Sequence, residues 1–296
     1  MSEHLVATRD RRRLRTQQWG NPAGAVVFLL HGTPGSRLGP KPRDALLYRQ
    51  GIRLITYDRP GYGDSDRLPG RLVAHAADDV ADIADFFGID RFSVIGRSGG
   101  GPHALACAAM LPARVRRAAA LVSLAPFDAE GLDWMAGMTP SNVDLYTAAR
   151  RGTGEMADRL EQTAALVLAD PTARMPFEDK DLPESDRMVI ADYGIKEMLV
   201  SNFHEGLRRS TSGWLDDSLS FLEPWGFSLA DICVPVLLWH GEEDIFSPVS
   251  HTQWLAKHIP HADVSIESGA AHFGSVAVLP GMLRRLVADG PAAMAA

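Results

Sequence analysis

Largely apolar runs without polar alternation recur along most of the chain. They occupy residues 25–30, 52–57, 92–95, 118–122 and 234–239. A run of this kind is typical of a strand that is covered on both faces in a parallel sheet. Segments with helical spacing separate the runs, and repeated strand–helix units favour a doubly wound sheet with right-handed crossovers. We therefore predict an α/β fold with a mostly parallel sheet.

Further elements extend this pattern toward both ends of the chain. In residues 72–87, apolar side chains recur at helical spacing with acidic side chains on the other face, and Gly88 follows as a helix cap. The stretches 4–8 and 12–19 predict two antiparallel edge strands. The small-residue tail, 290–296, is expected to be frayed. Also expected are helices at 41–50, 248–258 and 275–288 and a strand at 263–267.

The strand pattern is absent from the middle of the chain. Residues 126–229 instead show helical patterns that Gly and Pro interrupt, with many Trp and Met side chains. We predict that they form a helical cap, inserted into a core domain made of residues 1–125 and 230–296. Most large side chains of the cap should form its own core. Some, such as Trp134 or Met138, are expected to influence substrate choice.

Composition and charge limit the possible partners. The 296 residues are 46% hydrophobic and 23% charged, as in a soluble globular protein with one α/β domain and an insertion. The formal net charge of -7 gives no basic field to attract phosphates, so nucleic acid is not an expected partner. No apolar segment is long enough to cross a bilayer, and the N-terminus lacks the apolar core of a signal peptide. We expect a cytoplasmic monomer or homodimer that acts on a small-molecule substrate.

Neither the cysteines nor the histidines predict a metal or cofactor site. Cys107 and Cys233 lie in apolar runs and should be small buried thiols. Two cysteines can build neither a disulfide framework nor a Cys-based metal site. His251, His258 and His261 lie along an expected surface helix without acidic ligands at metal spacing.

The sequence Gly96-Arg97-Ser98-Gly99-Gly100 lies between a predicted strand and a predicted helix. Gly-x-Ser-x-Gly in this context is the pattern of a nucleophile elbow. Such a turn exposes the serine hydroxyl at strained dihedral angles, and its glycines remove side chains that would collide. Because the pattern is short, a glycine-rich turn with an idle serine is the alternative.

Five separated motifs, in this order, resemble those of the α/β-hydrolase fold superfamily with a helical cap. The resemblance spans essentially the whole chain and points to the branch of esterases, proline iminopeptidases and C–C hydrolases. Besides the elbow, the motifs are the oxyanion loop at 31–35, a structural turn at 58–65, the acid loop at 241–244 with Pro248 following, and the histidine loop at 269–273.

The resemblance implies a catalytic triad of Ser98, Asp244 and His272, in the chain order expected of this fold. A free serine hydroxyl is inert at neutral pH, so an imidazole is needed to take its proton. Glu242 and Glu243 flank the implied acid and should be solvated, with Glu243 as the fallback. Asp128 and Glu130, after the preceding strand, are further candidates for the acid.

The backbone amides of Thr33 and Gly99 are expected to form the oxyanion hole. The Thr33 hydroxyl can add a hydrogen bond there or be purely structural. His31 should hold the loop through a structural hydrogen bond. Arg97 departs from the relatives, where an aromatic, small or histidine residue often precedes the nucleophile. It can hold a substrate carboxylate, but we expect it to pair with an acid behind the sheet.

These features predict a serine hydrolase that cleaves a small-to-medium, mostly apolar ester or lactone through an acyl-enzyme. Hydrolysis of a C–C bond or of an amide on the same triad is an alternative, because a fold does not fix the bond cleaved. A non-catalytic, hydrolase-like binding protein is a further alternative. Epoxide hydrolase and dehalogenase chemistry needs an aspartate nucleophile, so Ser98 argues against it.

Overall fold

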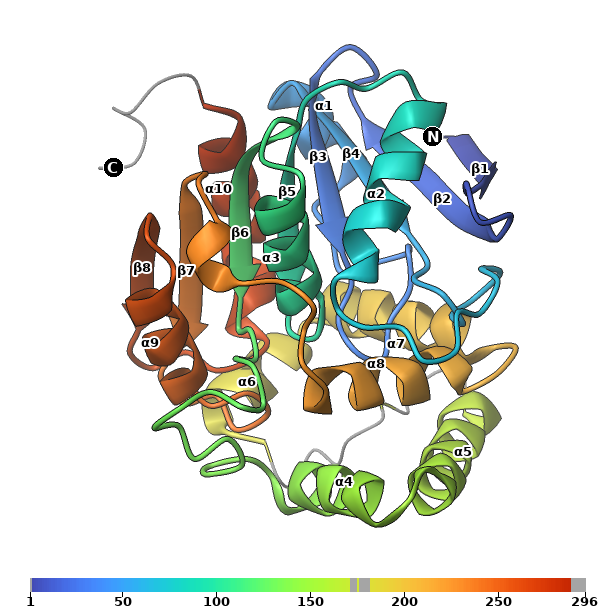
Figure 1. Ribbon diagram of the computed structural model, residues 1–296, viewed down its shortest axis with the longest axis vertical. Coiled ribbons are helices and arrows are strands. Elements are labelled where there is room, and N and C mark those ends of the chain that lie inside the picture. The colour runs from blue at the N-terminus through green and yellow to red at the C-terminus, as the bar shows by residue number, and fades with distance from the viewer. Residues whose placement is uncertain (1, 171–174, 176–181, 289–296) are drawn as a thin grey trace.

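An eight-stranded sheet forms the centre of the molecule (Figure 1). The structure is a computed structural model that describes residues 2–170, 175 and 182–288. The strands are β1 (Ser2–Ala7), β2 (Arg13–Gly20), β3 (Ala25–Leu30), β4 (Ile52–Tyr57), β5 (Phe92–Arg97), β6 (Val115–Leu121), β7 (Val236–Gly241) and β8 (Ala262–Glu267). Their order across the sheet is β1-β2-β4-β3-β5-β6-β7-β8.

The sheet is parallel except at one edge. The β1–β2 and β2–β4 pairs are antiparallel, and all other neighbouring strands run parallel. The central strand β5, which precedes the elbow, is buried along its whole length. This arrangement confirms the predicted α/β fold with a mostly parallel sheet and an antiparallel edge at the N-terminus.

Helices cover both faces of the sheet, because successive side chains of a strand point to opposite faces. In β3, Phe28 and Leu30 belong to the cluster that includes α2 and α3, whereas Val27 and Leu29 pack with α1 and α10. The helix α9 covers the same face as α2 and α3. The covering helices are α1 (Asp44–Arg49), α2 (His75–Phe86), α3 (Gly100–Met110), α9 (Val249–His258) and α10 (Gly274–Val287).

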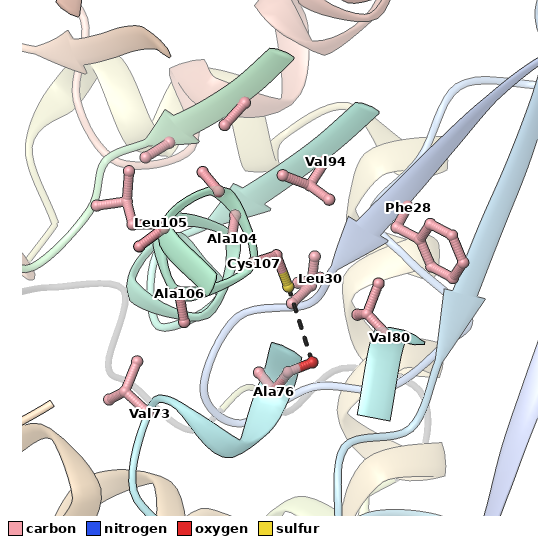
Figure 2. Close-up of a cluster of buried hydrophobic side chains, with 14 of the residues drawn as sticks. Phe28, Leu30, Val73, Ala76, Val80, Val94, Ala104, Leu105, Ala106 and Cys107 are labelled. Atoms are coloured by element: carbon pink, nitrogen blue, oxygen red, sulfur yellow. Dashed lines mark hydrogen bonds between the residues drawn. The ribbon is translucent and has the colours of Figure 1, made fainter. Parts of the chain in front are cut away.

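A cluster of buried apolar side chains lies where α3 packs on β3 and β5 (Figure 2). Here the Cys107 thiol points at the carbonyl oxygen of Ala76, 3.7 Å away, and burial raises its pKa. The prediction of a second buried thiol was wrong, because Cys233 is exposed. It lies between buried Ile232 and buried Val234, and its thiol donates to the Asp231 carbonyl at 3.3 Å.

Helices fill much of the described segment between β6 and β7, but they begin only at Pro140, and residues 126–139 form turns and irregular chain where a helical insertion was predicted. Figure 1 places the helices α4 to α8 beyond the ends to which the parallel strands point. Loops that follow parallel strands lie at this edge, where the elbow also lies. The boundaries of a separate cap domain stay a prediction. The helices are α4 (Pro140–Arg151), α5 (Thr153–Ala169), α6 (Glu184–Ile190), α7 (Tyr193–Leu207), α8 (Ser212–Leu222) and the short 3₁₀ turn η2 (Leu229–Asp231).

The described residues contain neither a cluster of metal ligands nor a helix that could span a membrane. Within residues 2–170, 175 and 182–288, no three or more His, Cys, Asp or Glu side chains are grouped so as to hold a metal ion. In the same residues, no helix combines the length and hydrophobicity that crossing a bilayer requires. The predicted frayed tail, 290–296, lies outside the described residues.

Candidate active site

Ser98 sits on a strained turn between β5 and α3. Its φ angle is 54°, in the left-handed region that side chains other than glycine rarely adopt. A Cβ atom on Gly96 would lie 2.0 Å from the carbonyl oxygen of Gly100, and one on Gly100 would lie 2.2 Å from that of Leu30. The turn therefore requires glycine at both positions, as the sequence predicted.

Asp244 and His272 are joined by a short hydrogen bond. His272 Nδ1 lies 2.8 Å from Asp244 Oδ2, and the backbone amides of Phe246 and Ser247 donate to Oδ1 over 2.8 Å and 3.1 Å. Burial alone would raise the pKa of the Asp244 carboxyl, but His272 and His240 hold it below its usual range. Asp244 is thus a buried carboxylate that fixes one nitrogen of the imidazole.

His240 is a neighbour of Asp244 that the sequence did not single out. It is fully buried on β7, with Nε2 2.6 Å from the Ser247 carbonyl and 3.2 Å from Asp244 Oδ2. Both of these oxygens are acceptors, so Nε2 carries the proton, and Nδ1 accepts from the Thr252 hydroxyl at 2.7 Å. His240 therefore supports the side of Asp244 that also faces His272.

The other acids considered from sequence lie away from His272. Glu242 and Glu243 are exposed, and Glu243 accepts a hydrogen bond from Ser185. Asp128 and Glu130 are also exposed. The contact with the imidazole belongs to Asp244.

Thr33 and Gly99 lie against each other beside Ser98. A Cβ atom on Gly99 would lie 2.2 Å from Thr33 Oγ1. Within the described residues, the backbone amide of neither residue donates a hydrogen bond to the protein. The free amide of Gly99 at the start of α3 and that of Thr33 in the loop after β3 can together receive a developing negative charge.

The Thr33 hydroxyl is engaged elsewhere. It donates over 2.7 Å to Oδ2 of Asp217, a fully buried carboxylate on α8. Arg59, Arg71 and Tyr62 also donate to Asp217, at 2.6, 2.6 and 2.8 Å. Burial alone would raise the pKa of Asp217, but Arg59 and Arg71 hold it well below its usual range. This cluster was not predicted from the sequence, although Arg59 and Tyr62 belong to the motif at 58–65.

Two buried histidines connect this cluster to the loops that flank Ser98. His31 Nε2 accepts from the Arg59 amide at 3.1 Å, and its Nδ1 donates to the Gly32 carbonyl at 2.7 Å, which is the structural role expected for it. His103 Nδ1 lies 2.7 Å from the Gly99 carbonyl. Burial, with Arg59 nearby, lowers the pKa of His31 well below 6.5 and that of His103 to about 3, so both are neutral.

Ser98, His272, Thr33 and Gly99 line one cavity of about 110 Å³. Its apolar wall comes mainly from the inserted helices. Trp134 and Met138 are buried in the cluster that packs on the sheet and do not line the cavity. The apolar lining residues of the inserted helices are Leu145, Tyr146, Phe203, Trp214 and Phe221.

The surroundings of Arg97 and His251 differ from those predicted from the sequence. Within the described residues, no carboxylate forms an ion pair with Arg97, because its guanidinium stays on the cavity side, between Phe273 and Gly32. His251 is not on the surface of α9 but fully buried, where it bonds the Ala125 amide and the Trp134 carbonyl at 3.0 Å each.

The sheet, the strained serine turn and the neighbouring Asp–His pair define an α/β-hydrolase class of protein. The sequence profile described as "alpha/beta hydrolase fold" matches residues 25–276, so the chain belongs to this family.

The chain is similar to known proteins over most of its own length and most of theirs. The chain is 26% identical over 246 residues to "Bifunctional esterase/perhydrolase DCH" of Acinetobacter calcoaceticus, covering 82% of this chain and 83% of that protein. It is 27% identical over 286 residues to "2-hydroxymuconate semialdehyde hydrolase" of Pseudomonas putida, covering 93% and 89%. The crystal structure of the enol-lactonase from Burkholderia xenovorans LB400 aligns with a TM-score of 0.69 at 19% identity, covering 96% and 99%. The activities in the names of these relatives differ, so the substrate does not follow from likeness alone.

Proposed function

We propose that the protein is a serine hydrolase that cleaves a small ester or lactone through an acyl-enzyme. The observation that carries this proposal is that His272, bonded through Nδ1 to Asp244, lines the same cavity as Ser98 on its strained turn. A histidine held in this way has Nε2 free to act as a base. The Acinetobacter relative, named as an esterase, supports the ester as the bond cleaved.

Each residue has one role in the proposed reaction. The Ser98 hydroxyl attacks the carbonyl carbon while His272 takes its proton and passes it to the leaving alcohol. Asp244 holds the imidazole in the required tautomer, and the amides of Gly99 and Thr33 bind the oxyanion. Water then attacks the acyl-enzyme, with His272 as base again, and releases the acid.

The size of the cavity favours a short acyl group. Its volume of about 110 Å³ is small beside the roughly 300–1,000 Å³ of pockets for drug-sized ligands. The apolar wall from α4, α7 and α8 fits a short hydrocarbon chain. Long-chain lipids are therefore poor candidates for the substrate.

Cleavage of a C–C bond is the second candidate. The Pseudomonas relative, named as a semialdehyde hydrolase, matches 93% of this chain and supports it. Amide cleavage and a non-catalytic binding role remain as outcomes that the same experiment separates.

A fluorophosphonate probe tests the nucleophile first. The purified protein should be labelled, and Ser98→Ala and His272→Ala should not be. A panel of p-nitrophenyl esters from acetate to octanoate, run beside a diketone and a dipeptide amide, then identifies the bond. Fastest turnover of a short ester is expected. Preference for the diketone or the amide would replace the ester proposal, and absence of both labelling and turnover would indicate a binding protein.

The double variant Ser98→Ala, His272→Ala completes this test. Residues that act as a unit show strongly non-additive losses, so the double variant should be no slower than either single variant. Additive losses would mean that the two side chains do not share one mechanism.

A further inference from the structure

Arg97 is unlike the other buried arginines of the described chain. Arg37, Arg59 and Arg71 each form an ion pair of 2.6–2.7 Å with a buried aspartate. Arg97 is only 6% exposed and, within the same described residues, forms no ion pair. A buried cation is normally paired, because its charge loses the stabilisation that water provides. Arg97 therefore carries a buried charge that no carboxylate of the described residues neutralises by contact.

The guanidinium is held in place but not satisfied. Its Nε donates to the Ser275 hydroxyl over 2.6 Å, and its carbon lies 5.2 Å from the centre of the Phe273 ring. Within the described residues, the buried Nη2 has no hydrogen-bond partner, and Nη1, on the side of Gly32, donates to no protein group either. The contacts of Nε and of the Phe273 ring therefore fix the plane of the guanidinium and leave Nη1 to donate to another group in the cavity.

Two nearby carboxylates act on Arg97 only from a distance. Asp244 is occupied by His272, His240 and two backbone amides, and Asp186 on α6 accepts from the Phe273 amide at 2.7 Å through Oδ1. Burial lowers the pKa of Arg97 to about 10, so it remains charged near neutral pH. Burial also raises the pKa of Asp186, and within the described residues its Oδ2 has no hydrogen-bond partner. A further carboxylate nearby would favour protonated Asp186, which could then donate.

Arg97 also lies directly beside the proposed nucleophile. A point at the Cβ position of Gly32 would be 3.7 Å from Arg97 Nη1 and 3.5 Å from Ser98 Cβ. Gly32, Arg97 and Ser98 all line the same cavity. A group that is bonded to Arg97 can therefore belong to the same small molecule that Ser98 attacks.

We propose that Arg97 binds a carboxylate of the substrate, so that the ester or lactone cleaved at Ser98 carries an acid group. This inference rests on the proposed function and narrows its substrate class. The carboxylate supplies the counter-ion that Arg97 lacks within the described residues and accepts from Nη1, as charge-assisted Arg–carboxylate bonds do. Because the cavity is small, the acid is short, such as a monoester of a short dicarboxylic acid or a lactone bearing a carboxylate.

The test compares two substrates that differ in one group. Monomethyl succinate and methyl butyrate have the same length, but the first ends in a carboxylate and the second in a methyl group. The unaltered enzyme should show a higher kcat/KM for monomethyl succinate. In Arg97→Gln, the ratio of the two kcat/KM values should fall by about 10- to 100-fold, the range for a hydrogen-bonded charge. Arg97→Lys, which keeps the charge, should restore part of the ratio.

Arg67→Gln is the matched control. Arg67 pairs with Asp216 on α8 and does not line the cavity, so its loss removes a contact to the inserted helices without touching the site. The ratio should stay as in the unaltered enzyme. An equal fall in this control would assign the effect to the helices and overturn the carboxylate site.

The two proposals fail in different ways. Equal use of both esters by the unaltered enzyme, or an unchanged ratio in Arg97→Gln, overturns the carboxylate site while the esterase stands. No probe labelling and no ester turnover overturns the proposed function instead. In that case, calorimetry with monomethyl succinate and methyl butyrate decides the site, because preferential binding of the acid supports it and equal binding refutes it. The substrate comparison on the unaltered enzyme holds even if Arg97→Gln does not fold.

Discussion

The hydroxyl of Thr33 donates a 2.7 Å hydrogen bond to Asp217, 184 positions later in the chain. Thr33 lies in the loop after β3, and its backbone amide is proposed to bind the oxyanion. Asp217 lies on α8, one of the inserted helices. Arg59 and Tyr62 donate to the same carboxylate oxygen at 2.6 Å and 2.8 Å, so this carboxylate is fixed. The position of the loop beside Ser98 therefore depends on a residue outside the strand and loop motifs of the family.

Asp217→Asn should damage both stability and turnover. The amide has nearly the same shape, but it leaves Arg59 and Arg71 without their counter-ion. Breaking a buried ion pair costs about 3–5 kcal/mol, and loss of one oxyanion donor lowers kcat by roughly 10²–10³. We expect a fall of about 3 kcal/mol in the free energy of unfolding. The kcat for the best ester should fall at least about 10-fold, as partial misplacement of one donor implies. Denaturant unfolding and steady-state kinetics measure the two effects.

Asp216→Asn is the control for this variant. Asp216 is the preceding residue and pairs with Arg67, whose side chain is 43% exposed, so the pair is screened by water. We expect a loss below about 1 kcal/mol and an unchanged kcat. Similar losses of kcat in both variants would attribute the effect to α8 as a whole rather than to the loop contact.

Asp244→Asn should slow turnover strongly without abolishing it. The amide can no longer hold the His272 tautomer that leaves Nε2 free, while the nucleophile and the base remain. A comparable change in a serine protease lowers kcat by about 10⁴. Glu243→Gln is the matched control, because Glu243 is the adjacent, exposed acid. A larger loss of kcat in Glu243→Gln than in Asp244→Asn would mean that the acid is Glu243 and that its assignment to Asp244 is one residue too late.

Most of the fold follows from short-range pattern, because a strand buried on both faces must be apolar at successive positions. The run at 25–30 coincides with β3. Agreement is poorer where polar residues interrupt the pattern. The strand predicted at 118–122 begins at Val115, because Arg116 and Arg117 broke the apolar run. The helix predicted from residue 41 begins only at Asp44, since a proline at position 42 disfavours helical geometry just before it.

The site was predictable only where local motifs carry it. Ser98 stands in a turn that demands glycines nearby in sequence, so five residues reveal it. Asp217 stands on an amphipathic helix and forms its contacts with residues far away in the chain. From sequence it is one more acid on a polar face. The buried positions of His240 and His251 were not predicted for the same reason, because burial by distant elements leaves no local sequence pattern.

His251→Gln should change how stability depends on pH. Burial lowers the pKa of His251 to about 4, against an ordinary value of 6.5. Between these values the unfolded chain binds a proton that the folded state refuses. As the pH is lowered from about 6.5 to 4, the unfolding free energy of the unaltered protein should therefore decrease, relative to that of the variant, by roughly 1 kcal/mol per pH unit. Glutamine cannot titrate but can make both hydrogen bonds.

His258→Gln on the exposed side of α9 is the reference for this comparison. Denaturant unfolding at pH 7, 6 and 5 gives the three slopes. If the His251→Gln slope matches those of the unaltered protein and of His258→Gln, the imidazole is not held neutral in the fold.

Leu145→Ala should shift the enzyme toward longer acyl chains. Leu145 lies on α4, lines the cavity and is half-buried, so its truncation extends the apolar space without removing a core residue. Each methylene that gains burial contributes about 0.8 kcal/mol, which is about 4-fold in kcat/KM. We expect hexanoate to gain on butyrate by about this factor per added methylene. The p-nitrophenyl ester series measures the shift, and the fluorophosphonate should still label Ser98.

Met138→Ala separates the shape of the cavity from the general packing of the helical segment. Met138 is buried in the same segment but does not line the cavity, so its loss should lower stability and leave the chain-length profile unchanged. This result would correct the sequence-based expectation that Met138 influences substrate choice. The opposite pattern, with a shift in Met138→Ala and none in Leu145→Ala, would mean that packing within the segment, rather than the cavity wall, sets the acyl length.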